Sequence, residues 1–361
     1  MNRPTILLNP GPVTLSDRVR RALMHEDVCH REPDFAQLML DIKRRLAHVY
    51  PQVDDEFDAI ALTGSGTCAV EAMIASFAPR ETKTLVLANG VYGDRIIEML
   101  KAHHRPMVQA QSAWIDAINF ERAEQLLADD ETITHVVAVH NETTTGRLND
   151  VEALLALAAR HKRQLMLDAV SSFGAEAIDF THPNLLAAAS TGNKCLHGIV
   201  GIAFVMARKA VLASATSQSD SLYLDLFAYH KAQQKGFSPF TQATHACFAL
   251  AEALAELEES GGWRARQTRY QTLSAAIRDA LDELGVQLYL PDEAYSSMIS
   301  SFHLPKGWTY ERLHDELRAA GFVIYAGQGN LSKSMFRICN MGDIQDEDLD
   351  RLLSVLRRLL G

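Results

Sequence analysis

Two charged side chains stand at the ends of mostly apolar or small-residue runs, and both could take part in chemistry. Asp168 ends the run "LMLD", and Lys194 follows 26 residues later (194 − 168) in the stretch "STGNKCLHG". A carboxylate at the end of a buried strand is costly to desolvate unless it meets a cation or a strong donor. An amine held on a loop can bond covalently to a carbonyl. The alternatives are a helix-capping aspartate and a solvent-exposed lysine.

A third feature is the glycine-rich turn in "LTGSGTCAVEAM". Backbone N–H groups at Ser65, Gly66 and Thr67 could converge on a phosphate, with the positive end of a helix behind them. The stretch matches neither GxGxxG nor GxxxxGK[ST], so a plain tight turn is the alternative. A phosphate cradle, a carboxylate for a protonated ring nitrogen and an amine are together the groups that hold pyridoxal 5′-phosphate.

The elements that must position these groups indicate an α/β fold. Five stretches of the sequence each start with an apolar run: 57–67, 83–93, 134–146, 164–174 and 201–207. Amphipathic helical stretches such as 150–163 separate them, which predicts a mainly parallel sheet covered on both sides. We expect one helix and one strand between Asp168 and Lys194, so that both lie at the carboxyl edge of the sheet, where ligands bind.

The pattern changes after residue 260. Gly261 and Gly262 end one helix, another amphipathic stretch covers 266–284, and strands are expected within 295–305 and 334–342, before a final helix over 346–360. These elements predict a smaller α+β unit. The sequence thus predicts a large domain with a mainly parallel sheet and a smaller C-terminal domain, with the boundary near 260.

Composition excludes several classes of protein. The 361 residues are 47% hydrophobic and 22% charged, with a formal net charge of −10 and dispersed basic residues, which disfavours nucleic acid as a partner. No apolar stretch is long enough for a membrane span, and the start lacks a signal-peptide pattern, so we expect a cytoplasmic protein that does not bind a membrane. Five scattered cysteines suggest reduced thiols, without a disulfide framework or a metal site.

Longer motifs show a resemblance to a known family. They are "LLNPGPVTLSDRVRRAL", "GSGTCAVEA", "NGVYGDR", "VHNETTTGRLN", "DAVSSFGA", "NKCLHG", "SLYLDLFAY", "GFVIYAGQ" and "FRICNMGDI", in order from about residue 5 to residue 345. They resemble the class V aminotransferases of fold type I, and within that class the members that act on 2-aminoethylphosphonate and pyruvate. The resemblance implies a fold-type I, pyridoxal-phosphate-dependent transferase with a large domain over 21–260 and a small one over 261–361.

The resemblance also implies roles for individual residues. Lys194 is expected to form the Schiff base and to move protons, and Asp168 to pair with the pyridine nitrogen. The other residues that it implies near the cofactor are Ser65, Gly66, Thr67, Tyr92, Thr143, Thr145, Thr191 and Thr244. Tyr92 is expected to stack on the ring, with a core tyrosine as the alternative. Thr244 is expected to reach the phosphate of the partner subunit, which implies a homodimer with shared active sites.

Three further residues are implied at the substrate. Residues 1–20 are expected to line its site, with Pro12 in contact through the backbone, and Arg337 to hold its acidic group. Arg31 lies in "CHREPDF", which differs from the pattern of some members and is similar to the alanine–glyoxylate branch. We expect Arg31 to add positive potential for a phosphonate. The alternative is that it forms a surface ion pair with Glu32 or Asp34 or fixes the entrance loop.

The expected reaction moves the amino group of 2-aminoethylphosphonate to pyruvate, giving phosphonoacetaldehyde and L-alanine. One alternative is an alanine–glyoxylate, serine–glyoxylate or other small-substrate class V aminotransferase. Another is a cysteine lyase or desulfurase, for which Cys339 is the nearest candidate nucleophile, although it lies in an expected strand. A non-catalytic binding protein is disfavoured by the presence of both Lys194 and Asp168.

Overall fold

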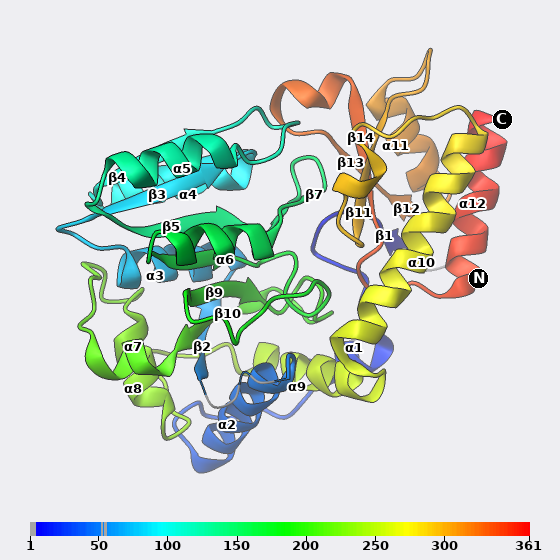
Figure 1. Ribbon diagram of the computed structural model, residues 1–361. Coiled ribbons are helices and arrows are strands. Elements are labelled where there is room, and N and C mark those ends of the chain that lie inside the picture. Colours follow the sequence, from blue (N-terminus) through cyan, green and yellow to red (C-terminus); the bar gives the residue numbers. More distant parts are fainter. Residues whose placement is uncertain (1–4, 52, 54–55) are drawn as a thin grey trace.

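A seven-stranded sheet forms the centre of the computed structural model, which describes residues 5–51, 53 and 56–361 (Figure 1). Its strands, in spatial order, are β2 (Phe57–Gly64), β10 (Gly201–Arg208), β9 (Leu185–Thr191), β8 (Gln164–Asp168), β5 (Ile133–Val139), β3 (Lys83–Ala88) and β4 (Met107–Gln111). Strand β10 is antiparallel to both of its neighbours, and the other neighbouring pairs are parallel. The predicted mainly parallel sheet is confirmed.

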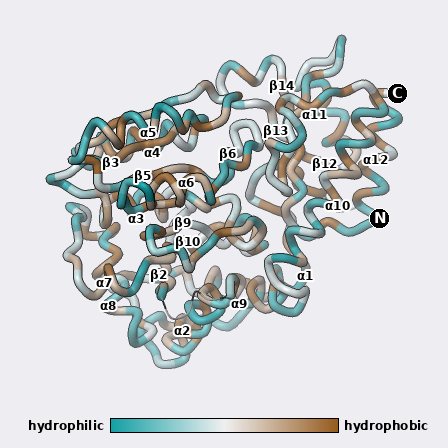
Figure 2. The backbone as a smooth tube through the Cα atoms, in the orientation of Figure 1, coloured by the Kyte–Doolittle hydropathy of each residue, from teal (hydrophilic) through white to brown (hydrophobic). Residues whose placement is uncertain are grey.

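Apolar side chains alternate between the two faces of the sheet, and each face has its own core. In β5, Val136 and Ala138 pack into one core, while Val137 and Val139 pack into the other. The first core is covered by α2 (Pro33–His48), α5 (Phe120–Asp129), α6 (Val151–Arg160) and α9 (Thr244–Glu259). The second is covered by α3 (Gly66–Phe77), α4 (Val91–Ala102), α7 (Lys209–Ser214) and α8 (Leu226–Gln233). Figure 2 shows that hydrophobic residues are concentrated in and around the central sheet.

The chain enters a second unit (residues 261–361, the C-terminal unit) through Gly261, whose φ of +96° favours glycine. Helix α10 (Gly262–Glu283) starts there and lies beside α12 (Asp346–Leu360), as Figure 1 shows. A three-stranded antiparallel sheet has the order β11 (Ile299–His303), β14 (Met335–Cys339), β13 (Tyr325–Ala326). The expected change of pattern after 260 therefore corresponds to a separate small sheet.

Short elements complete the two units. They are β1 (Ile6–Leu7), α1 (Asp17–Ala22), β6 (Asn141–Glu142), β7 (Arg147–Leu148), η1 (Asp292–Ala294), α11 (Tyr310–Ala319), β12 (Phe322–Val323) and η2 (Gly329–Lys333). Strand β1 pairs in parallel with β12 in a separate two-stranded sheet, so the start of the described chain is joined to the C-terminal unit.

The expected helix between Asp168 and Lys194 is wrong. Residues 169–184 form turns, and β8 connects through them directly to its parallel neighbour β9. The carboxylate of Asp168 accepts the N–H of Val170, Gly174 has a φ of +88°, and the carboxylate of Asp179 accepts the N–H of Thr181. These local bonds and the left-handed glycine compete with helix formation. Both residues still lie at the carboxyl edge, as the prediction required.

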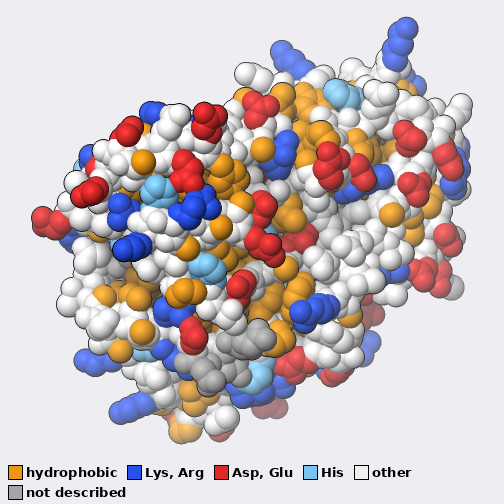
Figure 3. Space-filling view, in the orientation of Figure 1, with side chains coloured by type: hydrophobic (Ala, Val, Ile, Leu, Met, Phe, Trp, Pro, Cys, Tyr) orange, Lys and Arg blue, Asp and Glu red, His pale blue; other side chains and the backbone are white. Residues whose placement is uncertain are grey.

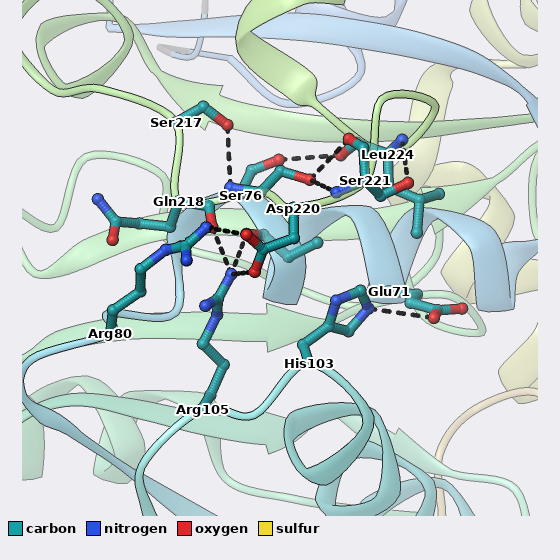
Figure 4. Close-up of polar contacts among 12 residues, drawn as sticks. Glu71, Ser76, Arg80, His103, Arg105, Ser217, Gln218, Asp220, Ser221 and Leu224 are labelled. Carbon is teal, nitrogen blue, oxygen red and sulfur yellow. Dashed lines mark hydrogen bonds and ion pairs between the residues drawn. The ribbon is translucent and has the colours of Figure 1, made fainter.

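A polar network holds the loop between α7 and α8 (Figure 4). Arg80 and Arg105 both donate to the carbonyl of Gln218 and both face Asp220. Beyond this point Tyr223 donates to the carbonyl of Thr63, 2.9 Å away, near the end of β2. The loop is thereby tied to the strand that leads into the glycine-rich turn.

The surface carries interspersed acidic and basic side chains on the face drawn in Figure 3. Among the residues that the structure describes, no helix is long and apolar enough to cross a membrane.

Candidate active site

Strands β2, β3, β5, β8 and β9 point in the same direction, and the residues that follow them meet at one edge of the sheet. Asp168 ends β8, Thr191 ends β9, and Gly64 ends β2. The candidate site is therefore built from strand ends that are far apart in sequence, as is usual for parallel α/β sheets.

The carboxyl group of Asp168 is buried, with 6% of the residue exposed. It accepts the backbone N–H of Val170 at 2.9 Å, and no ion pair to it exists in the described part of the chain. Burial raises the pKa of Asp168 to about 6, although the Val170 N–H and the nearby charges of Lys194 and Arg95 lower it. A buried carboxylate that forms no ion pair suits a protonated ring nitrogen.

Lys194 is partly buried beneath the N-terminal segment. Its Nζ donates to the carbonyl of Pro10, and a Cβ atom added at Gly11 would lie 2.8 Å from that nitrogen. Gly11 has a φ of +100°, so both its conformation and the lack of a side chain are needed for this contact. Lys194 is thus held at the site by the chain around residue 10, and it is not the solvent-exposed loop lysine of the alternative interpretation.

The glycine-rich turn forms the expected start of a helix. Ser65 is the N-cap of α3, and its side chain makes no capping hydrogen bond. A Cβ atom at Gly66 would lie 2.7 Å from the Cγ1 atom of Val170, so glycine lets the helix approach the segment that follows Asp168. The first N–H groups of any helix lack intrahelical acceptors. The turn is therefore suited to receive an anion beside Asp168.

Tyr92 and Arg95 extend from one face of α4 towards this turn. The guanidinium group of Arg95 lies 4.9 Å from the centre of the Tyr92 ring, and its Nη1 atom lies 3.2 Å from the hydroxyl oxygen of Thr67. Together with Asp168 and Val170, these three residues line a small cavity. Tyr92 thus lines the same small cavity as Asp168, and it also packs partly against the hydrophobic core.

Arg337 is almost completely buried in β14, with 2% of the residue exposed. Its Nε and Nη2 atoms donate to the carbonyl of Ala326 at 2.9 and 2.7 Å, and its Nη1 atom donates to the carbonyl of Thr143. It forms no ion pair with a described carboxylate. Burial lowers the pKa of Arg337, and Tyr92 and Glu142 are near enough to oppose that shift. An arginine buried without a counter-ion suits an anionic ligand.

The other predicted threonines are buried near the same edge. Thr143 offers its carbonyl to Arg337, whereas the Thr145 hydroxyl lies 3.5 Å from the carbonyl of Trp114. The Thr191 hydroxyl lies 2.8 Å from Oδ1 of Asn193 and 3.2 Å from the carbonyl of Ile202. The Thr145 and Thr191 hydroxyls thus have acceptors within the chain itself.

Three predicted residues are exposed or half-buried. Pro12 is exposed next to Gly11, and its carbonyl accepts the side-chain amide of Asn9 at 2.9 Å. Arg31 is exposed, and the described chain contains no ion pair between it and Glu32 or Asp34, contrary to the surface-pair alternative. Thr244 begins α9 and is half-buried.

Glu142 is a buried site residue that the sequence analysis missed. It is fully buried, and burial raises its pKa to about 7, with a smaller contribution from the charge of Asp168. Its carboxylate accepts the hydroxyl of Thr144 at 2.6 Å and the N–H of Gly93 at 3.2 Å. A glutamate three residues after the apolar run 136–139 was the available signal, since a carboxylate there needs donors.

Cys339, the candidate nucleophile of the desulfurase alternative, lies within β14 and is fully buried. Burial raises the pKa of this thiol to about 12, and its backbone N–H donates to the carbonyl of Leu8. A nucleophilic cysteine needs the thiolate form and access to the substrate. The structure therefore disfavours this alternative for Cys339.

Comparisons with known proteins agree with this architecture. A family model described as "Aminotransferase class-V" matches residues 18–351. A 2-aminoethylphosphonate–pyruvate transaminase from Bacillus mycoides is 36% identical over 357 residues, which cover 98% of this chain and 97% of the relative. An aspartate aminotransferase from Thermus thermophilus has a similar structure, with a TM-score of 0.87, 27% identity, and coverage of 98% of this chain and 99% of the other.

The fold is shared more widely. An alanine–glyoxylate aminotransferase from Nostoc superposes with a TM-score of 0.88 and 23% identity, covering 100% of this chain and 96% of the other. The architecture is that of the fold-type I aminotransferases, and the cofactor of such enzymes is pyridoxal 5′-phosphate. The family-model match over most of the chain and the full-length relative above 30% identity lead to one conclusion: this protein belongs to the class V aminotransferases.

Proposed function

We propose that this protein transfers the amino group of 2-aminoethylphosphonate to pyruvate, giving phosphonoacetaldehyde and L-alanine. The observation that carries the proposal is the buried guanidinium group of Arg337, which has no carboxylate partner among the described residues and donates to the carbonyl of Thr143, in the segment that follows β5. The name of the Bacillus mycoides relative supports the choice of substrates.

Pyridoxal phosphate, when bound, supplies an aldehyde that takes up the amino group and a ring that accepts electrons from the donor carbon. The residues present fit it. Ser65, Gly66 and Thr67 would bind the phosphate, Asp168 would hold a proton on the ring nitrogen, and Tyr92 would cover one face of the ring. Thr143, Thr145 and Thr191 would line the site. The hydroxyl groups of Thr145 and Thr191 could donate to the cofactor only by giving up the acceptors that they have within the chain.

Lys194 has two roles in this proposal. Its Nζ atom would hold the cofactor covalently, and displacement by the amine of the donor would leave Nζ as a free base. Nζ would then act as the base that takes the proton from the amino-bearing carbon of the donor and as the acid that returns it. The hydrogen bond to the Pro10 carbonyl holds this amine beside the N-terminal segment.

Arg337 would bind the acidic group of the substrate. A guanidinium group has five N–H donors, and the structure uses three of them for carbonyl groups of Ala326 and Thr143. One N–H on each Nη atom is left, and two such donors suit two oxygens of a carboxylate or phosphonate. A second positive charge would favour a phosphonate, and we propose Arg31 for it because this residue is exposed and has no ion pair in the described chain.

We also propose that the protein is a homodimer in which Thr244 contacts the cofactor phosphate of the partner. Large apolar side chains are exposed around the start of α9: Met24 is 84% exposed, Leu222 is 80% exposed and Tyr223 is 38% exposed. The neighbouring residue His25 stacks on Phe248 of α9 at 3.7 Å, and Tyr223 lies 5.1 Å from the ring of Phe240. Exposed apolar side chains of this kind favour burial against another chain.

The test is a comparison of amino donors with the purified protein and pyridoxal phosphate. The catalytic efficiency for 2-aminoethylphosphonate with pyruvate should exceed that for β-alanine, the carboxylate analogue, and the aldehyde product should be phosphonoacetaldehyde. A higher efficiency for alanine or serine with glyoxylate would refute the proposed substrates and favour the alternative to which the "CHREPDF" segment points.

A further inference from the structure

The carboxylate of Glu142 lies against the first turn of α4, although Glu142 belongs to the segment after β5. Its Oε2 atom accepts the N–H of Gly93 at 3.2 Å, and a Cβ atom at Gly90 would overlap the carboxyl group. Gly90 is the N-cap of α4 and has no side chain with which to cap the helix. A negative group at a helix N-terminus is stabilised by the N–H groups and the helix dipole. Glu142 therefore supplies the cap from another element.

Thr144 completes the same cap. Its hydroxyl accepts the N–H of Val91 at 2.9 Å and donates to Oε1 of Glu142 at 2.6 Å, and the N–H of Thr144 donates to the same Oε1 at 3.2 Å. Both side chains are fully buried. Two of the first N–H groups of α4 thus have their acceptors on residues 142 and 144.

The capped turn carries side chains of the candidate site. Tyr92 lies between Val91 and Gly93, the two residues whose N–H groups are held, and Arg95 follows one turn later. The segment that supplies the cap is fixed in turn, because Arg337 donates to the carbonyl of Thr143. In addition, the Thr144 hydroxyl lies 3.2 Å from Oε1 of Gln328 in the C-terminal unit. The cap therefore connects the helix of Tyr92 to the segment of Arg337.

We propose that Glu142 and Thr144 are positioning residues that hold the first turn of α4 so that the ring of Tyr92 stays in place over the cofactor ring. Neither residue needs to touch the cofactor or the substrate for this role. The inference rests on the proposed function, since it assumes that Tyr92 covers the cofactor, and it adds to that function the groups that fix the orientation of the tyrosine.

The test uses Thr144→Val, which removes the hydroxyl with little change in shape, and Thr144→Ser, which keeps it. We expect Thr144→Val to bind pyridoxal phosphate roughly fivefold more weakly, which corresponds to about 1 kcal/mol, the typical cost of losing a helix-capping group. The induced circular dichroism of the bound cofactor should also decrease, because it depends on the orientation of the ring that covers it. Thr144→Ser should restore both properties.

Thr309→Val is the matched control. The Thr309 side chain caps α11 by accepting the N–H of Arg312, so the same chemical change removes a cap from a helix of the C-terminal unit. It should lower stability without changing cofactor affinity or the induced signal. Glu142→Gln provides an independent variant of nearly equal size, because its amide NH₂ must face one of the N–H groups that the carboxylate now accepts. It should weaken cofactor binding in the same direction.

The outcomes separate the inference from the function on which it rests. If wild-type protein binds no pyridoxal phosphate, the proposed function is wrong. If the wild type binds it and both Thr144→Val and Glu142→Gln bind it with affinity within twofold and with the same induced signal, the positioning role is wrong and the function stands. Should Thr144→Val fail to fold, the Glu142→Gln result decides in the same way.

Discussion

Replacing Asp168 by Asn should make the cofactor-free protein more stable at neutral pH while it damages the enzyme. Burial raises the pKa of Asp168 from its ordinary value of 3.8 to about 6. A group whose pKa is raised by folding contributes its full stability below the unfolded pKa, and this contribution is lost as the pH rises through the folded pKa. For Asp168 the loss therefore occurs between about pH 4 and pH 7.

The size of the effect follows from the change in pKa. Each tenfold change in acidity corresponds to about 1.4 kcal/mol, so a rise from 3.8 to about 6 predicts a loss of up to about 3 kcal/mol. Asn has nearly the same shape, remains neutral and can still accept the N–H of Val170 through its side-chain oxygen. The unfolding free energy of the variant should therefore exceed that of the wild type by a margin that grows by up to about 3 kcal/mol as the pH rises across this range.

The assay is urea unfolding of the cofactor-free wild type and of Asp168→Asn at several pH values between 4 and 8. Asp129→Asn, which alters an exposed carboxylate at the end of α5, is the control and should show no comparable growth with pH. A constant difference between Asp168→Asn and wild type across the range would refute the reasoning that the buried carboxylate lacks compensation. With pyridoxal phosphate bound, the wild type should be more stable than Asp168→Asn, because the variant then lacks the partner of the ring nitrogen. The variant should also turn over more slowly, with an activation free energy that is higher by several kcal/mol.

Three further predictions concern single side chains. Lys194→Ala should abolish turnover and leave the far-ultraviolet circular dichroism unchanged, and a variant that keeps a tenth of the wild-type rate would show that Lys194 does not bond to the cofactor. Thr244→Val should weaken cofactor binding by about 1.5–3 kcal/mol because one hydroxyl on a charged phosphate is lost, and equal dissociation constants for the two proteins would contradict this role. Arg31→Ala should lose roughly 1–3 kcal/mol of discrimination between 2-aminoethylphosphonate and β-alanine, mostly through the phosphonate, whereas an equal loss for both substrates would make Arg31 a structural residue.

Much of the sheet could be predicted from the sequence because buried parallel strands leave a simple pattern. The runs that begin at 57, 83, 134 and 164 are apolar on both faces and end in small or polar residues, and each contains a strand. Strand β4 was missed since its sequence, MVQAQ, mixes polar and apolar residues, and only one of its five residues is buried. The wrong helix before β9 had a local cause, namely the hydrogen bonds and the glycine of residues 169–184.

Some residues of the candidate site could likewise be predicted from the sequence, and others could not. Asp168, Lys194 and the turn at Ser65 could be predicted, because a charged side chain or a glycine-rich turn at the end of an apolar run is a local pattern typical of ligand sites in parallel sheets. The roles of Glu142 and Arg95 depend on side-chain contacts with residues distant in sequence: Gly90 and Gly93 for the first, and Thr67 for the second. No local pattern encodes such contacts. The carbonyl of Pro10 as the partner of Lys194 likewise depends on the path of the N-terminal segment.

Covalent capture of the cofactor tests the central claim most directly. Borohydride reduction of the protein loaded with pyridoxal phosphate makes the bond between amine and cofactor permanent, and peptide mass mapping then locates the modified residue. The account predicts one modified peptide, with the cofactor on the amine of Lys194, and no modification in Lys194→Ala. Stoichiometric modification at another lysine, or an unmodified Lys194 in protein that transaminates, would contradict it.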